Sequence, residues 1–507
     1  MNSTQKLIAG GILASGVALF YLGLNSGTWL ISPDSTDYVE GARSLAALRG
    51  YVDASGSPLT FFPPGTSVLY AVAALLPAAD YVYFNLLTKL LVVAFVGLSF
   101  AVVRRSAGTA PALVVVLFLL LSQTLLSEST HILSDPAFGA ALMLTTFLFP
   151  ENRIDNLSPR AALGLGLMAA ACYAFRTVGM CVFLAYVAAI ALRAQHRRVR
   201  TIGLVSLVFM IVAVPLALRA AAGEYSYFRM MFWREQWVSD SGMAGLSDWW
   251  ARASINLRST LSDMHHVLTN ERDVGLSGVA IAGLILLGVV AAIVNRRVLH
   301  VSILFFYTLA LVAMGSAPRY ILPVIPLLAL TAIDGGRWTI SWPQTRWAAR
   351  GLTMALLAVV CVSPYWWNGY LHARSLRAEL NRFQGAAVAD PGHGEFLDLV
   401  RSHASELTPA DVVATMHPNV LRYFLPDDVT LWVMPITEDP EEAYRAITDR
   451  SVTYLYCDKA VTTIWSRIAP VIERHPSRFA LVAENPSAVI YRVLAEPEVA
   501  GRDSLVR

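Results

Sequence analysis

The chain has 507 residues, of which 56% are hydrophobic and only 15% are charged, and its formal net charge is +3. The apolar residues come in long runs instead of alternating patterns, which is typical of a polytopic membrane protein. So small a net charge gives no sign of a nucleic-acid partner, and membrane topology already explains where the arginines gather. Four cysteines predict neither a disulfide framework nor a cysteine-based metal site.

A transmembrane helix needs about 17 to 25 residues, and about eleven apolar runs qualify when tight ends are allowed. The predicted spans are 7–24, 82–103, 110–127, 135–150, 160–176, 178–194, 201–220, 274–295, 299–315, 319–334 and 351–367. The first run lacks a small-residue cleavage site, so we expect a retained helix and not a signal peptide. The run 66–78 is too short to cross and is predicted to be a re-entrant or interfacial helix.

Arginine clusters set the expected orientation, because short cytoplasmic loops collect positive charge. Five clusters fall on one side of the predicted arrangement, and they are Arg104–Arg105, Arg153 with Arg160, Arg193 to Arg200, Arg296–Arg297 and Arg337 to Arg350. The N-terminus shares this cytoplasmic side, and an odd number of spans sends the C-terminal tail outside. Arginine greatly outnumbers lysine, as in GC-rich bacterial genomes, so we expect a multi-pass protein of the bacterial inner (plasma) membrane.

The tail after residue 370 differs from the rest because charges are spread through it and its apolar runs are short. Strand-like runs alternate at first with helical patterns, which is typical of a small α/β domain. We expect strands at 411–416, 429–434, 452–457, 479–484 and 488–493, and helices at 394–406, 439–449 and 462–474. The tail has no phosphate-binding loop, dinucleotide fingerprint or serine nucleophile elbow. We therefore expect this domain to have a supporting or binding role and not a catalytic one.

Two domains follow from these patterns. Residues 1–370 form a predicted membrane module with long external loops at 25–81 and 221–273, and residues 371–507 form an extracytoplasmic α/β domain. The predicted fold class is therefore a polytopic α-helical membrane protein with a small C-terminal α/β domain. On this topology, Cys457 lies outside, where a thiol reagent should reach it.

The first external loop begins with carboxylates where a membrane helix should surface. Ionisable groups at a bilayer boundary are costly unless they have a function, so Asp34 and Asp37 mark the first candidate site. Alternatively, Asp34 is a helix N-cap and Asp37 its capping-box partner. Pro63-Pro64-Gly65 opens a second short helix in the same loop. The residues that would share the buried stripe of the first helix are Tyr38, Ala42, Leu45 and Leu48.

A second acidic group lies between two spans on the same predicted face. Glu128, His131 and Asp135 fall within eight positions, which is an unusual density of ionisable groups at a membrane boundary. Part of this pattern has a structural explanation, because Ser134 or Asp135 before Pro136 makes a good helix start. A single interfacial histidine is also often no more than a hydrogen-bonded group.

Two arginines lie on the predicted external side, where the preference of positive charge for cytoplasmic loops does not explain them. Arg176 and Arg319 are candidate anion ligands, since a guanidinium can grip two phosphate oxygens at once. The alternative is that both reach lipid phosphates at the membrane surface. In the aromatic-rich external loop, Arg229 and Arg234 lie among tyrosines and tryptophans that suit either an interfacial belt or a platform for a sugar ring. His265-His266 has no matching ligands nearby, so no metal site is expected there.

The arrangement resembles that of the GT-C membrane glycosyltransferases, especially protein O-mannosyltransferases, lipid A aminoarabinose transferases and bacterial relatives that add sugars to surface glycans. In those enzymes the first external loop begins with an acidic motif, a tyrosine and an interfacial helix, followed by a Pro-Pro element. A later acidic position and an Arg-Tyr pair that opens a late span complete the pattern. The matching segments here are 34–38, 63–65, 134–136 and Arg319-Tyr320. The chain departs at the first motif, with Asp34-Ser35 in place of the usual Asp-Glu.

The resemblance implies inverting transfer of a hexosyl or pentosyl group from a polyprenyl-phosphate donor to an acceptor hydroxyl at the extracytoplasmic face. Asp34 would be the general base, with Asp135 and Asp37 as further acids, and Arg176, Arg319 and Tyr320 would bind the donor phosphate. The acceptor would be a glycan, a lipid or a protein. No cofactor is implied, although oligosaccharyltransferases of the same superfamily use a divalent metal. The residues expected to line the site are Tyr38, Glu128, His131, Arg229 and Arg234.

Two other functions share parts of this pattern. A lipid or glycan transporter would also have many spans, but it should place polar residues or broken helices near the bilayer midplane. Here the ionisable residues gather at one face, which favours surface chemistry. A lipid-linked glycan ligase or polymerase would share the donor and topology but not the acidic first loop.

Overall fold

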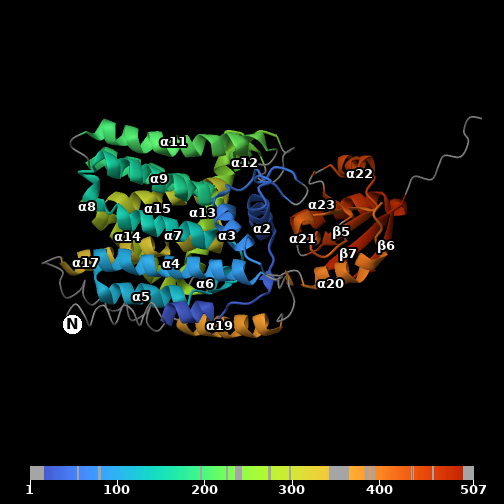
Figure 1. Cartoon of the computed structure of the whole chain (residues 1–507), viewed down its shortest axis with the longest axis horizontal. Helices are drawn as coiled ribbons and strands as arrows, with labels where there is room; N and C mark the ends of the chain where they lie inside the picture. The colour runs from blue at the N-terminus through green and yellow to red at the C-terminus, as the bar shows by residue number, and fades with distance from the viewer. Residues whose placement is uncertain are drawn as a thin grey trace, which may run out of the picture. The chain divides into compact units, whose positions relative to one another are not determined.

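The computed structural model describes residues 16–53, 56–77, 81–193, 197–223, 227–234, 242–271, 276–295, 298–341, 365–382, 388–389, 394–426, 428–434, 437, 439–459 and 462–494. The chain forms two compact units (Figure 1). The first consists of Met1–Trp29, Asp37–Gln236 and Met243–Ala387, and the second of Leu30–Thr36, Trp237–Gly242 and Val388–Arg507.

The first unit is a bundle of apolar helices. Within the described ranges, three helical stretches are long and apolar enough to cross a membrane, judged by length and composition. They are Val82–Ala107 (α4), Arg198–Ala222 (α11) and Pro318–Trp338, which comprises α16 (Pro318–Ile321), η3 (Leu322–Val324) and most of α17 (Ile325–Ser341).

Further helices complete the first unit. The apolar ones are α3 (Gly65–Ala74), α5 (Thr109–Leu120), α7 (Asp135–Leu148), α9 (Pro159–Phe175), η1 (Thr177–Gly179), α10 (Met180–Arg193), α14 (Leu276–Val294) and α15 (Val298–Met314). The others are α6 (Gln123–Glu128), α8 (Glu151–Ile154), α12 (Tyr227–Phe232), α13 (Leu246–Thr269) and α19 (Tyr365–Arg382). A further helix, α2 (Pro33–Ala46), begins in the second unit and continues into the first.

Most predicted spans have a helix at the expected place, but the number of eleven is not confirmed. The predicted span 110–127 is wrong as a single helix. Here α5 ends at Leu120, and Ser122 starts α6 by accepting a hydrogen bond from the Leu125 amide at 3.3 Å. The predicted span 7–24 is described only from residue 16, and residues 16–22 are helical. The predicted span 351–367 falls outside the described residues except for 365–367.

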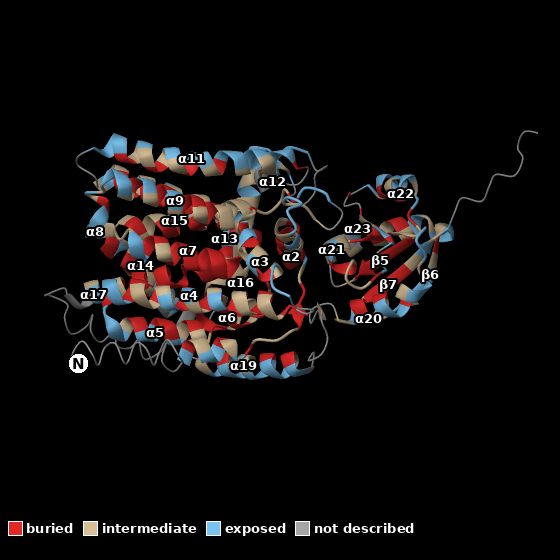
Figure 2. Ribbon diagram, in the orientation of Figure 1, coloured by how far each residue is buried: buried red, intermediate tan, exposed pale blue. Residues whose placement is uncertain are grey.

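Close helix contacts through glycine hold the bundle together. A Cβ on Gly288 of α14 would overlap the carbonyl of Thr331 in α17. A Cβ on Gly335 of α17 would likewise overlap the carbonyl of Leu284 in α14. Small residues let helix backbones approach closely, which is how helices gain packing energy in a lipid environment. As Figure 2 shows, α7 is buried along most of its length, and it lies between α4 and α9.

The second unit carries a five-stranded sheet in the order β4-β3-β5-β7-β6. β3 pairs in parallel with β4 and β5, whereas β7 pairs in antiparallel fashion with β5 and β6. The strands are β3 (Val412–Thr415), β4 (Thr430–Val433), β5 (Tyr454–Asp458), β6 (Phe479–Glu484) and β7 (Ala488–Val493). The helices are α20 (Gly394–His403), η4 (Ala404–Glu406), α21 (Pro418–Leu421), α22 (Pro440–Asp449), α23 (Thr462–Arg474) and η5 (Pro476–Arg478). Two-residue strands occur at β1 (Trp29–Leu30) and β2 (Val388–Ala389).

The α/β character predicted for the tail is confirmed, since every expected strand and helix lies within a few residues of its predicted place. Leu455, Ile468 and Val489 are among the residues of its buried core. The expectation that a thiol reagent reaches Cys457 is wrong. Cys457 is 4% exposed in β5, and burial raises the pKa of its thiol to about 12, which suppresses the reactive thiolate.

We predict that Gly288→Ala destabilises the bundle. The added methyl group has no room between α14 and α17, and overpacking costs roughly 1 to 3 kcal/mol. Thermal unfolding of the purified protein in detergent measures the effect as a lower Tm. Gly203→Ala in α11 is the matched control, because nothing lies within 4 Å of its Cβ position. Equal Tm values for the two variants would contradict the packing argument.

Candidate functional site

The start of α2 is capped by serines and not by the aspartates. The Ser32 amide donates to Ser35 Oγ at 2.8 Å, and the Ser35 amide donates to Ser32 Oγ at 3.3 Å. This reciprocal pair is a capping box two residues before the predicted one. The alternative in which Asp34 is the N-cap and Asp37 its partner is therefore wrong. Asp34 lies half-buried in the first turn of α2, where the helix dipole favours a carboxylate.

The middle of α2 is held against the bundle by Tyr38. Its hydroxyl donates to Ser134 Oγ at 2.9 Å, and its carbonyl accepts from Ser67 Oγ at 3.1 Å. Tyr38 is 2% exposed, as predicted for the buried stripe. The prediction that Leu48 belongs to this stripe is wrong, because the helix ends at Ala46. Leu48 lies beyond that end with φ at +57° and is 93% exposed.

The Pro-Pro-Gly element places α3 directly against the end of α9. A Cβ on Gly65 would lie 2.5 Å from the carbonyl oxygen of Ala174, so only glycine fits there without a shift. The next residue, Thr66, donates to the Phe175 carbonyl at 3.5 Å. Helix α3 thus packs beside Phe175, the residue before Arg176.

Asp135 and Arg176 form an ion pair between the start of α7 and the residue that ends α9. The Asp135 side chain is 2% exposed and that of Arg176 is 15% exposed. Ser134 is the N-cap of α7 but makes no side-chain capping bond, and its hydroxyl accepts from Tyr38 instead. The predicted helix start is confirmed, because Ser134 is the N-cap and Pro136 lies in the first turn of α7, but this start has no side-chain capping bond from Ser134.

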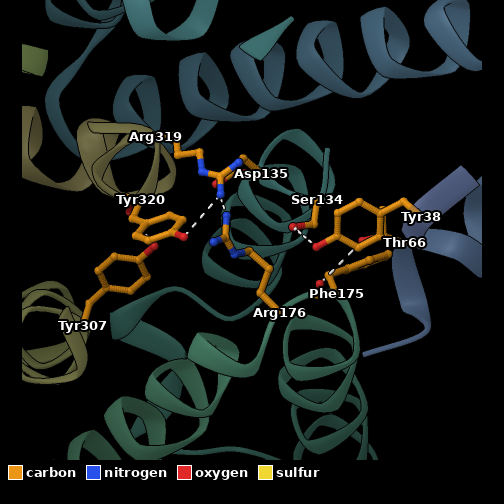
Figure 3. A network of polar contacts seen from close by, with 9 residues as sticks. All are labelled: Tyr38, Thr66, Ser134, Asp135, Phe175, Arg176, Tyr307, Arg319 and Tyr320. Carbon is orange, nitrogen blue, oxygen red and sulfur yellow. Dashed lines mark hydrogen bonds and ion pairs between the residues drawn. The ribbon is translucent and has the colours of Figure 1, made fainter. Parts of the chain in front are cut away.

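Arg176 and Arg319 both contact the ring of Tyr320 (Figure 3). Their guanidinium carbons lie 4.7 and 5.1 Å from its centroid, and Arg319 Nη2 donates to the Tyr320 hydroxyl at 3.3 Å. Figure 3 shows the two guanidinium groups pointing toward one another. Tyr307, which the sequence did not single out, donates to the Tyr320 carbonyl at 2.6 Å. We call Asp135, Arg176, Arg319 and Tyr320 the arginine–tyrosine cluster.

Lys89 is a buried lysine that our sequence analysis also missed. It is 1% exposed within α4, and its ammonium group donates to the Ser129 carbonyl. A charged residue inside the predicted span 82–103 was the available signal, because such residues are rare in membrane helices. This contact fixes the turn that follows α6. In that turn, half-buried Glu128 ends α6 and His131 Nδ1 lies 2.9 Å from the Ser127 carbonyl.

Arg229 and Arg234 make their described contacts elsewhere in the molecule. Arg229 Nη2 donates to the Ala221 carbonyl at 3.1 Å, which ties α12 back to the end of α11. Arg234 lies 3.9 Å from Asp248, and both arginines are exposed. These contacts join the parts of one loop and do not link either arginine to the arginine–tyrosine cluster.

The described part of the chain holds no group of three or more His, Cys, Asp or Glu side chains suited to a metal ion. The two arginines instead supply the concentrated positive charge of the first unit's candidate site. Guanidinium groups beside an aromatic ring form a rigid, planar arrangement of donors that suits phosphate oxygens. The cluster can therefore bind an anion and stabilise charge that develops on it.

No family model matches the chain, and no curated protein matches its sequence. Solved structures resemble it in fold. The Archaeoglobus fulgidus oligosaccharyltransferase in complex with Zn and sulfate has a TM-score of 0.53 and 11% identity, covering 94% of this chain and 72% of its own. AglB from the same archaeon, in complex with an inhibitory peptide and a dolichol-phosphate, has a TM-score of 0.51 and 10% identity, with 94% and 73% covered. ArnT from Cupriavidus metallidurans bound to undecaprenyl phosphate has a TM-score of 0.49 and 14% identity, with 98% and 99% covered.

We predict that the Tyr38–Ser134 hydrogen bond couples α2 to α7. Tyr38→Phe and Ser134→Ala each remove one hydrogen-bond partner from a buried hydroxyl. The loss of such a partner lowers the free energy of unfolding by about 1 to 3 kcal/mol. The double variant should lose less unfolding free energy than the two single variants lose together. The difference, which is the coupling energy of the double-mutant cycle, should be about 1 kcal/mol. Unfolding free energies in mixed detergent provide the measurement. Strictly additive losses would show that the hydroxyls do not act as a pair.

Proposed function

We propose that this chain, which has the fold of the GT-C membrane glycosyltransferases, transfers a sugar from a polyprenyl-phosphate donor to an acceptor hydroxyl. The transferred group is a hexose or a pentose, and the reaction takes place at the extracytoplasmic face of a bacterial inner membrane. The acceptor is a glycan, a lipid or a protein. The cytoplasmic N-terminus and extracytoplasmic 371–507 domain belong to the same proposal.

The observation that carries this proposal is the pair of guanidinium groups on the Tyr320 ring. When the bond between the anomeric carbon and the phosphate breaks, the leaving phosphate gains negative charge. In this proposal Arg176 and Arg319 stabilise that charge, as a metal ion does in other enzymes, and their shared contact with Tyr320 supports this role. The dolichol-phosphate in the AglB complex supports a lipid phosphate as the ligand.

Asp34 is the proposed general base. An alcohol is a poor nucleophile at neutral pH, so a positioned carboxylate must remove its proton as the oxygen attacks. The attack comes from the face opposite the leaving phosphate, so the anomeric configuration inverts. The capping of α2 by Ser32 and Ser35 supports this role, because the helix start does not need the Asp34 carboxylate as its cap.

The other acidic residues have supporting roles in this proposal. Asp135 holds Arg176 in place, and Asp37 helps to set the position of α2, which carries Asp34. Tyr38, Glu128 and His131 line the acceptor side of the site. Arg229 and Arg234 contribute through the aromatic-rich loop in which they lie.

We predict that Asp34→Asn abolishes sugar transfer while the protein still folds and inserts. Loss of a general base lowers the rate by about 10² to 10⁴. The assay is release of polyprenyl phosphate from a panel of polyprenyl-phosphate sugars by the purified protein in lipid, with acceptor extracts supplied. Asp53→Asn is the matched control, since Asp53 is another aspartate of the first external loop and accepts from the Ser57 amide at 2.9 Å. A fully active Asp34→Asn enzyme would remove Asp34 from the mechanism.

We predict that Arg176→Ala and Arg319→Ala each weaken donor binding. A hydrogen bond to a charged group contributes about 1.5 to 3 kcal/mol, so the Kd should rise roughly 10- to 100-fold. Titration of undecaprenyl phosphate into the protein in neutral nanodiscs gives this Kd. Arg105→Ala is the control, because Arg105 at the end of α4 donates to the Phe147 carbonyl at 3.1 Å and lies outside the cluster. Unchanged affinity in both variants would favour lipid-facing arginines.

A further inference from the structure

The segment 129–134, which joins α6 to α7, is buried although it belongs to neither helix. Ser129, Thr130 and Ser134 are 2% exposed or less, and Asp135, which follows them, is 2% exposed. Buried backbone outside a helix needs other partners for its carbonyl and amide groups, above all among apolar helices. A side chain that supplies such a partner helps to fix the position of Asp135.

Side chains of the segment itself bond to carbonyls of α6. Ser129 Oγ donates to the Leu126 carbonyl at 2.7 Å, and Thr130 Oγ1 donates to the Ser127 carbonyl at 2.7 Å. The Ser129 carbonyl instead accepts from the ammonium group of Lys89, which belongs to α4. The start of the segment is thus tied to another helix of the bundle.

Lys89 is a costly residue for this purpose. It is 1% exposed inside a helix that is long and apolar enough to cross a membrane. Burying an ammonium group there is unfavourable, and the Ser129 carbonyl to which it donates carries no charge. An ionisable residue at such a place is expected to have a function.

Resting on the proposed function, we propose that Lys89 is a positioning residue of the donor site. Its hydrogen bond holds the segment 129–134 so that Asp135, the next residue, meets Arg176. Without this bond the Ser129 carbonyl is buried without its partner, and the segment shifts to find another. Arg176 then loses the position in which it binds the donor phosphate.

Two other roles for Lys89 make different predictions. If Lys89 only stabilises the bundle, its loss lowers the Tm and leaves the donor affinity of the folded protein unchanged. If it binds the phosphate directly, its loss weakens donor binding whether or not Arg176 is present. If it acts through Arg176, its loss weakens donor binding only while that arginine is present.

The test is a double-mutant cycle on the full-length protein, with undecaprenyl phosphate titrated into phosphatidylcholine nanodiscs. Lys89→Met removes the N–H donors and keeps a long, unbranched side chain. Its Kd should rise about tenfold, because a hydrogen bond that places a charged group is lost. In the Arg176→Ala background the same change should alter the Kd by less than about twofold. The Asp135→Asn background should give the same result, since it breaks the same connection.

Two further variants isolate the hydrogen bond. Thr88→Val is the matched control, because Thr88 is also buried in α4 but bonds to Tyr70 at 2.7 Å and to the Phe84 carbonyl at 3.0 Å. This control should keep the wild-type Kd. Lys89→Gln keeps an N–H donor without the charge, so it should also bind the donor as the wild type does. It decides the question if Lys89→Met does not fold.

The outcomes are distinguishable. An unchanged Kd in Lys89→Met, an equal rise with and without Arg176, or a weakened donor affinity in Lys89→Gln overturns this role of Lys89. In each of these cases the wild type still binds the lipid, so the proposed function stands. If the wild type does not bind undecaprenyl phosphate, both the donor class and this inference are overturned.

Discussion

A charge buried in a bundle of apolar helices must be paired, and Asp135 meets this requirement with Arg176. Removing one partner of such a pair is strongly destabilising, so the start of α7 and the end of α9 are held at one fixed position. Tyr320 lies against the same guanidinium and brings α16 to that position. Tyr307 of α15 then fixes the Tyr320 backbone. The geometry of the candidate site follows from this one pair.

The segment 25–81 is built onto that arrangement through close backbone contact. Gly65 lets α3 approach the last turn of α9, and Tyr38 ties α2 to the residue before Asp135. Both contacts lie one or two residues from the ion pair in sequence. Helices α2 and α3 therefore both contact residues beside the ion pair.

The two units differ in the kinds of side chain that they bring together. The first contains the two guanidinium groups, the aromatic ring and the buried Asp135 carboxylate of the cluster, which suits a site that binds an anion and stabilises developing charge. The second has an α/β sheet with an ordinary apolar core, in which Cys457 is enclosed. In our proposal the first unit binds the donor phosphate, and the part of the second unit after residue 387 has a supporting or binding role.

The sequence by itself determined the helical membrane character, the places of most helices and the α/β tail, because these depend on local hydrophobic patterns. It also indicated Asp135, Arg176, Arg319 and Tyr320, since charged residues at a membrane boundary are conspicuous. Only the tertiary structure decided that these four lie together, that Asp135 pairs with Arg176, and that Ser32 and Ser35 cap α2. Such pairings depend on which helix ends meet in space. Periodicity along one chain carries no information about that distance, and for the same reason Tyr307 gave no signal.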